Sequence, residues 1–287
     1  MTVVAVTGAS GKTGRTVAEH LAESGIEVRA IDSAGPPGDR GTGPLPLLRA
    51  DLTDYGQTVD ALHGADAVVH LAAIPAPGFF PDAHTLSTNN AINSNVFLAA
   101  VKLGLQRVVW TSSETTLGFP FGDDTPPRYL PVDEAHYPMP RSTYALSKVV
   151  AATMADHLAD WSGIPFVALC LSNVHEVSDY PKVPSFQADV RSRVFNLWGY
   201  IDVRDVALAC RLALTAPVTG SRGYLIAADD TLMDTPSAEL ARQVFPDVPV
   251  TGALDGYASL LSNRRAREEL GFRPAHSWRD EVPTTQA

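Results

Sequence analysis

A tyrosine and a lysine stand four positions apart in the segment Tyr144-Ala145-Leu146-Ser147-Lys148. On a helix this spacing places both side chains on one face. A phenol has an ordinary pKa of about 10 and is a poor base at neutral pH, but an ammonium group beside it stabilises the phenolate and lowers that pKa. The pair could therefore accept a proton from a substrate hydroxyl, although ordinary helix surfaces also carry such pairs.

Hydroxyl side chains end the predicted strand before this helix, at Thr111, Ser112 and Ser113. Serines at strand ends are commonly loop formers. Here they precede the Tyr144 helix by about thirty residues, which suits a shared site at the carboxyl edge of a parallel sheet. Ser113 would hydrogen-bond the substrate oxygen as alkoxide character develops. The next residues, Glu114 and Thr115, could contact substrate hydroxyls or belong to the plain surface.

A glycine-rich turn near the start of the chain reads Thr7-Gly8-Ala9-Ser10-Gly11-Lys12-Thr13-Gly14. The first glycine permits a tight strand-to-helix turn, the second lets the backbone approach a phosphate, and the third allows close packing of the helix on the sheet. The serine, lysine and threonine between them supply hydroxyl or amide donors. The motif predicts a pyrophosphate site, and by itself it also fits a plain turn.

Asp32 makes the predicted ligand of this turn more specific. It closes the second predicted strand, 18 positions after Gly14, where a carboxylate accepts hydrogen bonds from the adenosine ribose of a dinucleotide. Its charge would repel a 2′-phosphate, which favours NAD over NADP. Asp51, followed by Leu52, comes where a further strand after Ile26–Ile31 is expected to have ended, and it could reach the adenine edge or cap the next helix. A further predicted strand ends in Leu71, Ala72 and Ala73. Small residues at this point would let the cofactor pass close to the backbone.

The composition is that of an ordinary globular protein of 287 residues, with 45% hydrophobic and 19% charged residues. A net charge of −10 argues against nucleic acid and anionic membranes as partners, since both select for basic patches. Apolar runs stay below the length of a membrane span, which predicts a cytoplasmic protein. The two cysteines, Cys170 and Cys210, lack metal-ligand spacing and are expected to be buried thiols, and we expect no metal.

Short apolar runs alternate with helical periodicity through the first 171 residues. The predicted strands are Val3–Val6, Ile26–Ile31, Ala67–Leu71, Arg107–Thr111 and Phe166–Leu171. The predicted helices are Thr13–Glu23, Thr58–Leu62, Asn89–Leu103 and Arg141–Trp161, and Ser33–Pro46 is a predicted loop. This alternation indicates an α/β fold in which helices cover both faces of a parallel sheet.

The pattern loosens after Asn173. Helices are predicted at Val203–Leu214, Ser237–Val244 and Ser262–Gly271, with a strand at Gly223–Ala227. We therefore expect a cofactor-binding domain at residues 1–172 and a smaller substrate-binding lobe at residues 173–287, placed over the carboxyl edge of the sheet. Part of this lobe, notably the Gly223 strand, could contribute to the main sheet.

Together these motifs resemble the short-chain dehydrogenase/reductase superfamily, and the glycine spacing is similar to its extended branch, the NAD-dependent epimerase/dehydratase family. Further matching segments are His70–Ala73, Asn89, Asn95, Tyr200–Ala207 and Leu270–Pro274. The resemblance implies a Rossmann-type doubly wound sheet with a small C-terminal substrate-binding lobe. It also implies NAD as cofactor and Ser113, Tyr144 and Lys148 as catalytic residues. Asn89, Thr111 and Ser172 would lie near the cofactor, with Tyr144 and Lys148, and Lys148 would anchor the nicotinamide ribose.

Departures from the family concern the substrate. The family often follows its sixth strand with Arg-x-x-Asn-x-Tyr-Gly-Pro, whereas the corresponding segment here keeps Asn173 but lacks the Arg and the Tyr-Gly-Pro. Sugar-nucleotide 4,6-dehydratases place Thr-Asp-Glu where this chain has Ser-Glu-Thr, and the missing Glu argues against that reaction. A small substrate, as in the family's uronate dehydrogenases, is credible. Arg191 or Arg193 could pair with a carboxylate or phosphate, or be solvated.

The leading prediction is an NAD-dependent oxidoreductase that removes hydride from a secondary hydroxyl carbon of a sugar or sugar-like substrate. The alternative is a sugar or nucleotide-sugar epimerase that retains NAD, since both reactions use the same Ser/Tyr/Lys set. A silent NAD-sensing protein is a third possibility, against which that intact set argues. The family commonly dimerises through the Asn89 and Tyr144 helices, so a homodimer is possible. Ala151, Ala152 and Met154 could pack there or in the core.

Overall fold

A seven-stranded parallel sheet forms the centre of the fold, as expected. The computed structural model describes residues 3–33 and 45–282, so most of the predicted Ser33–Pro46 loop lies outside the described residues. The strands follow the order β3-β2-β1-β4-β5-β6-β9. Their bounds are β1 Val3–Thr7, β2 Glu27–Asp32, β3 Leu47–Arg49, β4 Ala67–His70, β5 Arg107–Ser113, β6 Phe166–Leu171 and β9 Ser221–Ile226.

The order reverses direction at β1, which pairs in parallel with β2 on one side and β4 on the other. The two central strands read almost entirely as apolar residues, because helices cover both faces of a sheet of this kind. Ligands of doubly wound folds bind outside the carboxyl ends of the strands at such a reversal. Thr7 and His70, which end β1 and β4, therefore lie at the expected cofactor edge.

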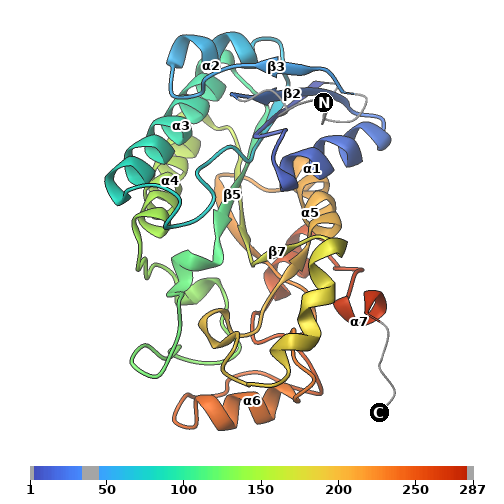
Figure 1. Cartoon of the computed structure of the whole chain (residues 1–287). Helices are drawn as coiled ribbons and strands as arrows, with labels where there is room; N and C mark the ends of the chain where they lie inside the picture. The colour runs from blue at the N-terminus through green and yellow to red at the C-terminus, as the bar shows by residue number, and fades with distance from the viewer. Residues whose placement is uncertain (1–2, 34–44, 283–287) are drawn as a thin grey trace. The chain divides into compact units, whose positions relative to one another are not determined.

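Helices flank the sheet on both sides (Figure 1). Their bounds are α1 Lys12–Glu23, α2 Tyr55–Leu62, α3 Asp82–Leu103, α4 Thr143–Ser162 and α5 Val203–Thr215. Figure 1 shows α2, α3 and α4 on one side of the sheet and α1 and α5 on the other. The Asp54 carboxylate caps α2 and the Ser142 hydroxyl caps α4, each accepting a hydrogen bond from a first-turn amide.

The start of α3 differs from the prediction, which placed it at Asn89. The helix begins at Asp82, and the residues before Asn89 are mostly polar and exposed, so they give no apolar periodicity. Asp82 lies in the first turn, where a negative charge is favourable. The predicted end was right, because Gly104 adopts the left-handed conformation with φ +68° and stops the helix.

Aromatic side chains fill the space between the sheet and the α3–α4 layer. The Phe97 ring packs edge-on against Trp110 and Phe166, with centroid separations of 5.5 and 5.2 Å. All three are buried in one cluster, so their role is in core packing. Ala151 is fully buried in the same cluster, and Ala152 and Met154 pack against it. The alternative in which Ala151, Ala152 and Met154 pack in the core is therefore correct.

The chain divides into two compact units, each assembled from three segments. The first comprises Met1–Ser112, Ser142–Leu169 and Ala207–Gly223, and the second comprises Ser113–Arg141, Cys170–Val206 and Tyr224–Ala287. This differs from a single division after residue 172, because the chain enters the second unit where β5 and β6 end and returns to the first unit with α5. The assignment of cofactor and substrate roles to separate parts stays a prediction.

The second unit contains mostly short elements. They are a two-stranded parallel sheet of β7 Val174–His175 and β8 Ile201–Asp202, helices α6 Ser237–Val244 and α7 Trp278–Glu281, and several 3₁₀ turns. The predicted charged helix Ser262–Gly271 is shorter, with a π-helical segment at Ala266–Leu270 that ends at Gly271. Two-residue strands carry no readable periodicity, so β7 and β8 could not be predicted.

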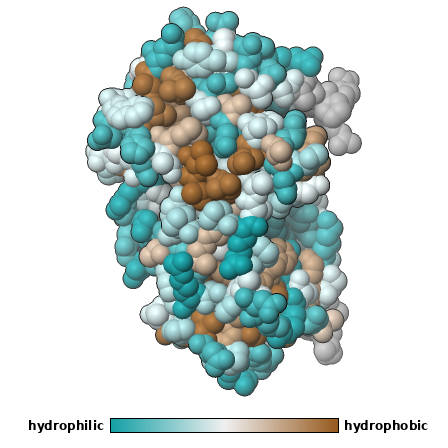
Figure 2. Space-filling view, turned by 90° about the vertical axis from the view of Figure 1, so that its left-hand side faces the viewer, coloured by the Kyte–Doolittle hydropathy of each residue, from teal (hydrophilic) through white to brown (hydrophobic). Residues whose placement is uncertain are grey.

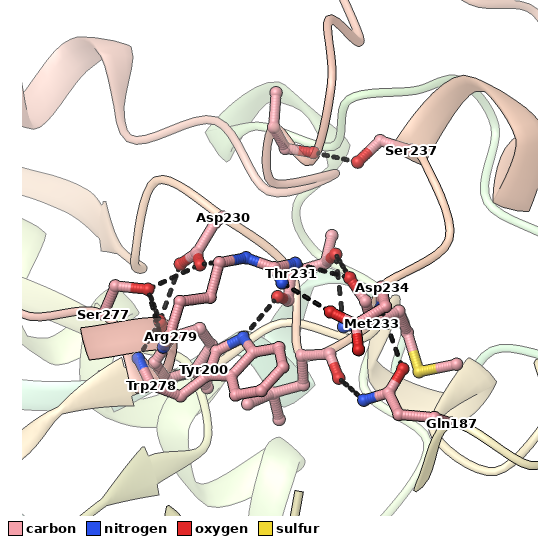
Figure 3. A network of polar contacts seen from close by, with 12 residues as sticks. Gln187, Tyr200, Asp230, Thr231, Met233, Asp234, Ser237, Ser277, Trp278 and Arg279 are labelled. Atoms are coloured by element: carbon pink, nitrogen blue, oxygen red, sulfur yellow. Dashed lines mark hydrogen bonds and ion pairs between the residues drawn. The ribbon is translucent and has the colours of Figure 1, made fainter. Parts of the chain in front are cut away.

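Polar contacts of Asp230 attach the last described segment to this unit (Figure 3). The Asp230 carboxylate accepts hydrogen bonds from the Tyr200 hydroxyl at 2.6 Å and the Ser277 hydroxyl at 2.7 Å. The Arg279 guanidinium donates to Asp234 at 2.6 Å and lies 4.0 Å from the Tyr257 ring centroid. These bonds hold α7 in place despite its length of 4 residues.

The close packing at Gly14 leads to a stability prediction. A Cβ at this position would overlap the carbonyl oxygen of Gly8 and lie 2.9 Å from the Cα of Ala9, so Gly14→Ala must displace the turn. We expect a loss of about 1–3 kcal/mol in the free energy of unfolding, measured by urea denaturation. Gly122→Ala is the matched control, because a Cβ there meets nothing within 4 Å. Equal stability of the two variants would contradict this packing argument.

Candidate active site

The β1–α1 turn has the backbone geometry that a phosphate requires. Gly8 adopts φ +69°, and a Cβ there would lie 2.8 Å from the Ala72 nitrogen, so only glycine lets the two segments approach. The Gly11 amide donates to the Gly8 carbonyl at 3.1 Å. Gly11 is also the N-cap of α1 and contributes no capping side chain. First-turn amides of this helix suit an anionic ligand, while Lys12 is exposed and Thr13 half-buried beside them.

The end of β2 lies against this turn. One Asp32 oxygen accepts hydrogen bonds from the Ser10 amide at 3.0 Å and the Ser10 hydroxyl at 2.5 Å. The structure therefore brings together two residues predicted for cofactor binding. Their contacts also show that Asp32 positions the turn. Its role toward a ribose, and that of Ser10 toward a phosphate, stay predictions.

Asp51 forms a local turn. Its carboxylate accepts from the Thr53 amide at 2.9 Å and the Thr53 hydroxyl at 2.7 Å, and these bonds lower the pKa of Asp51. The alternative that Asp51 caps the next helix is wrong, because Asp54 fills that position. Leu52 is buried, and its carbonyl accepts from the Asn95 side chain at 2.9 Å. A contact of either residue with adenine stays a prediction.

A hydrogen-bond chain that the sequence did not reveal joins the ends of β1 and β4. The Thr7 hydroxyl oxygen accepts from the Leu71 and Ala72 amides at 3.1 and 3.2 Å, so its hydrogen points to His70 Nδ1, 2.7 Å away. His70 Nε2 is then the protonated nitrogen, and it donates to the Asn93 side-chain oxygen at 3.0 Å. The sequence carried one signal for this chain of bonds: each of the two buried strands ends in a polar residue, Thr7 and His70.

His70 is neutral in this arrangement. It is fully buried, and burial together with the positive charge of Lys148 lowers its pKa to about 3. Asn89 fixes the segment that follows β4: its side chain accepts from the Ile74 amide at 2.8 Å and donates to the Ile74 carbonyl at 3.2 Å. It thereby fixes the backbone at Ile74, directly after Ala72 and Ala73. Direct contact of these residues with a cofactor stays a prediction.

Tyr144 and Lys148 lie together at the buried face of α4, as the spacing predicted. Lys148 Nζ donates to the Thr111 carbonyl at 2.7 Å and lies 5.8 Å from the centroid of the Tyr144 ring. Both residues are buried: the exposed fraction is 8% for Tyr144 and 2% for Lys148. An ammonium held this close to a phenol, away from bulk water, favours the phenolate. Strand β5 thus positions the lysine through its backbone.

Ser113, at the end of β5, is the first residue of the second unit. Its oxygen accepts hydrogen bonds from the Thr115 amide at 3.2 Å and the Thr115 hydroxyl at 3.0 Å. Thr115 therefore orients Ser113, and its own contact with substrate stays a prediction. Because Ser113 belongs to one unit and Tyr144 and Lys148 to the other, the joint action of the three also stays a prediction.

Glu114 is buried, so its reading as plain surface is wrong. Its carboxyl group accepts from the Ser172 hydroxyl at 2.6 Å. Burial raises the pKa of Glu114 to about 7, against the opposing effects of the Ser172 hydrogen bond and the charge of Arg193. Ser172, which was predicted to face the cofactor, is thus engaged by Glu114, and a cofactor contact of Ser172 stays a prediction.

The two candidate arginines have different surroundings. Arg191 is exposed and pairs with Asp123 at 2.8 Å, which matches the solvated alternative. Arg193 is half-buried, and its Nη2 donates to the Asn173 side-chain oxygen at 2.9 Å. His175 Nε2 lies 2.9 Å from the same oxygen. The structure therefore places Arg193, with Asn173, in the surroundings of Glu114.

Neither metal ligands nor a membrane span is found in the part of the chain that the structure describes. Within residues 3–33 and 45–282, no group of three or more His, Cys, Asp and Glu side chains is arranged to hold a metal ion. None of the helices within these ranges is both long and apolar enough to cross a bilayer. Cys170 and Cys210 are buried free thiols, and burial raises the pKa of Cys210 to about 12.

The parallel sheet, the glycine turn with Asp32, and the Tyr144–Lys148 pair are the features of the extended short-chain dehydrogenase type, which includes dehydrogenases and epimerases. Residues 4–227 match the NAD-dependent epimerase/dehydratase family, and the chain belongs to this family. It is therefore an NAD-dependent enzyme, and the expectations for fold class and cofactor are confirmed.

The chain is similar over most of its length to curated oxidoreductases. It is 28% identical over 274 residues to cinnamoyl-CoA reductase 1 of Petunia hybrida, covering 86% of this chain and 79% of that protein. It is 26% identical over 280 residues to L-arabinose 1-dehydrogenase (NAD(P)(+)) of Haloferax volcanii, covering 96% of both. A short-chain dehydrogenase/reductase superfamily protein from Agrobacterium tumefaciens, solved with bound NAD, has a TM-score of 0.73 at 22% identity and covers 97% of this chain and 94% of that one.

Burial of neutral His70 generates a pH prediction. Its pKa in the folded state lies below the ordinary value of 6.5, so the unfolded chain binds this proton first. His70 therefore lowers stability as pH falls from about 6.5 toward 3, by at most about 1.4 kcal/mol per pH unit. Urea unfolding at pH 7, 6 and 5 should show a smaller decline for His70→Gln than for the wild type.

The control for this experiment is His157→Gln, since His157 is exposed on α4. This variant should keep the wild-type decline with pH. His70→Gln also breaks the bonds to Thr7 and Asn93, so its stability at pH 7 should be lower. If His70→Gln kept the same pH dependence as the wild type, the neutral buried state of His70 would be disproved.

Proposed function

We propose that this protein is a sugar dehydrogenase that removes hydride from a carbon bearing a secondary hydroxyl and passes it to NAD. The observation that carries the proposal is the buried Tyr144–Lys148 pair, with Lys148 held by the carbonyl of Thr111 at 2.7 Å. The glycine turn and Asp32 supply the features that a dinucleotide requires. NAD, when bound, accepts the hydride.

Tyr144, Lys148 and Ser113 each have a separate role in the proton transfer. Tyr144, as phenolate, takes the proton of the substrate hydroxyl. Lys148, whose Nζ lies 5.8 Å from the centroid of the Tyr144 ring, stabilises the phenolate by its positive charge. Ser113 hydrogen-bonds the substrate oxygen while negative charge develops there. Thr115 donates two hydrogen bonds to the Ser113 oxygen, from its amide and from its hydroxyl.

Some of the relatives support sugars as the substrate class. Besides the L-arabinose 1-dehydrogenase, the chain is 28% identical over 165 residues to uronate dehydrogenase of Pseudomonas putida, covering 57% of this chain and 58% of that protein. Arg193 adds a cationic group in the unit that carries Ser113. A sugar acid is therefore the substrate we favour over a neutral sugar.

Steady-state assays test this proposal. Full-length protein with NAD and a panel of free sugars, uronates and nucleotide sugars should produce NADH, followed by absorbance. Tyr144→Phe should lose about 10²–10⁴-fold in kcat, because the proton acceptor is gone, while NAD binding measured by calorimetry persists. Tyr55→Phe is the control, since Tyr55 is exposed, and it should keep full activity. Formation of an epimer without NADH would instead establish the epimerase alternative, and unchanged turnover of Tyr144→Phe would exclude the mechanism.

We further propose that two copies associate through the α3 and α4 helices. Figure 2 looks onto the side on which these helices lie in Figure 1 and shows apolar side chains gathered there. Leu98 of α3 is 45% exposed, and Leu146 and Trp161 of α4 are 39% and 74% exposed. Large apolar groups left in water on adjacent helices favour burial against a second copy.

Light scattering coupled to size-exclusion chromatography tests the dimer. The wild type should elute with twice the mass of one chain, and Leu98→Asp should elute with the mass of a single chain, because the substitution would bury a charge. Leu48→Asp, at an exposed leucine on the edge strand β3, is the control and should not change the mass. A monomeric wild type at micromolar concentration would refute the proposal.

A further inference from the structure

The side chain of Asn89, on α3, joins two segments of the first unit that are far apart in the sequence. It is buried, with an exposed fraction of 1%. Its Oδ1 accepts from the Ile74 amide at 2.8 Å, and its Nδ2 donates to the Ile74 carbonyl at 3.2 Å and to the Ser147 hydroxyl at 3.4 Å. An amide side chain has two N–H donors, one for each of the last two bonds.

The first segment, residues 71–74, follows β4 and is held at both ends. At its start, two successive amides donate to the Thr7 hydroxyl at 3.1 and 3.2 Å, and at its end Asn89 bonds both backbone groups of one residue. The glycine turn also approaches it, since a Cβ at Gly8 would lie 2.8 Å from the nitrogen of Ala72. This segment therefore lies at the edge of the sheet where a dinucleotide binds in doubly wound folds.

The second segment is the start of α4, which carries Tyr144 and Lys148. Ser147 is fully buried between them. Its hydroxyl donates to the Tyr144 carbonyl at 2.7 Å, so its oxygen is the acceptor for Asn89. The next residue, Lys148, donates to the Thr111 carbonyl at 2.7 Å. Side-chain bonds thus hold this part of α4 both to α3 and to β5.

We propose that Asn89 and Ser147 are positioning residues that hold segment 71–74 and the Tyr144–Lys148 pair at a fixed separation, so that the nicotinamide end of NAD meets the pair. This inference rests on the proposed hydride transfer at Tyr144. The link is buried, so water cannot take the place of a lost partner, and the two segments would shift. Reacting groups must keep their places to within about 0.5 Å, which makes such a shift harmful.

Ligand binding tests this link without turnover. Calorimetric titrations compare NADH with ADP-ribose, which keeps the adenosine and pyrophosphate groups but lacks the nicotinamide. Ser147→Ala removes the acceptor for Asn89 and retains the helix, because alanine is the best helix former. The Kd for NADH should rise about three- to tenfold in this variant, while the Kd for ADP-ribose stays within about twofold of the wild-type value. Unchanged NADH binding, or equal weakening of both ligands, would overturn the proposal.

Thr143→Ala is the matched control. The Thr143 hydroxyl donates to Asp82 at 2.9 Å and so forms another bond between α4 and α3, but it is exposed and does not reach segment 71–74. Water can replace this bond, so the variant should keep the wild-type Kd for both ligands. If Thr143→Ala weakened NADH binding as much as Ser147→Ala, the effect would not be specific to the Asn89–Ser147 link, and the proposal would fall.

Turnover separates this inference from the proposed reaction. With a substrate found among the sugars, Ser147→Ala should lower kcat about tenfold and leave the KM for the sugar level, because orientation of the nicotinamide is lost and sugar contacts are not. If the wild type oxidises no sugar but Ser147→Ala weakens NADH alone, the reaction fails and the positioning role stands. If sugars are oxidised and both ligands bind the variant normally, the positioning role fails. Circular dichroism confirms that each variant is folded.

Discussion

The hydroxyl of Thr7 makes the contacts on which the carboxyl ends of β1 and β4 depend. It accepts from two successive backbone amides after β4 and donates to His70, and His70 in turn reaches Asn93 on α3. One side chain at the end of β1 thereby fixes the end of β4 and one face of a helix. The close approach of Gly8 to Ala72 follows from the same contact, since a side chain at Gly8 would separate the two segments.

Three buried ionisable groups have surroundings that act on their charge in different ways. Lys148 Nζ donates a hydrogen bond to the Thr111 carbonyl. His70 is kept neutral by burial and by the nearby lysine. Glu114 is poised between its two states, since burial favours the acid while Arg193 and Ser172 favour the carboxylate. Burial and the nearest polar partners thus act differently on each of these groups.

The sequence predicted the fold more fully than the site. The main strands and long helices were found because both leave apolar patterns. Elements too short for such a pattern, such as β7 and β8, and boundaries without one, such as the polar start of α3, were missed. Motif glycines and Asp32 could be placed because backbone conformation and strand order follow from the chain itself. The side-chain contacts of Ser10, Ser172 and Arg193 could not, because each depends on a segment distant in sequence.

By itself, the sequence determined the sheet, the glycine turn, the acidic residue at the end of β2 and the pairing of Tyr144 with Lys148, since all of these follow from local spacing. Tertiary structure decided which of two neighbouring arginines faces inward, that Glu114 is buried, and that Asp54 rather than Asp51 caps α2. The physical reason is that burial is a property of the assembled chain. A carboxylate or guanidinium acquires its pKa and partners only when remote segments exclude water from around it.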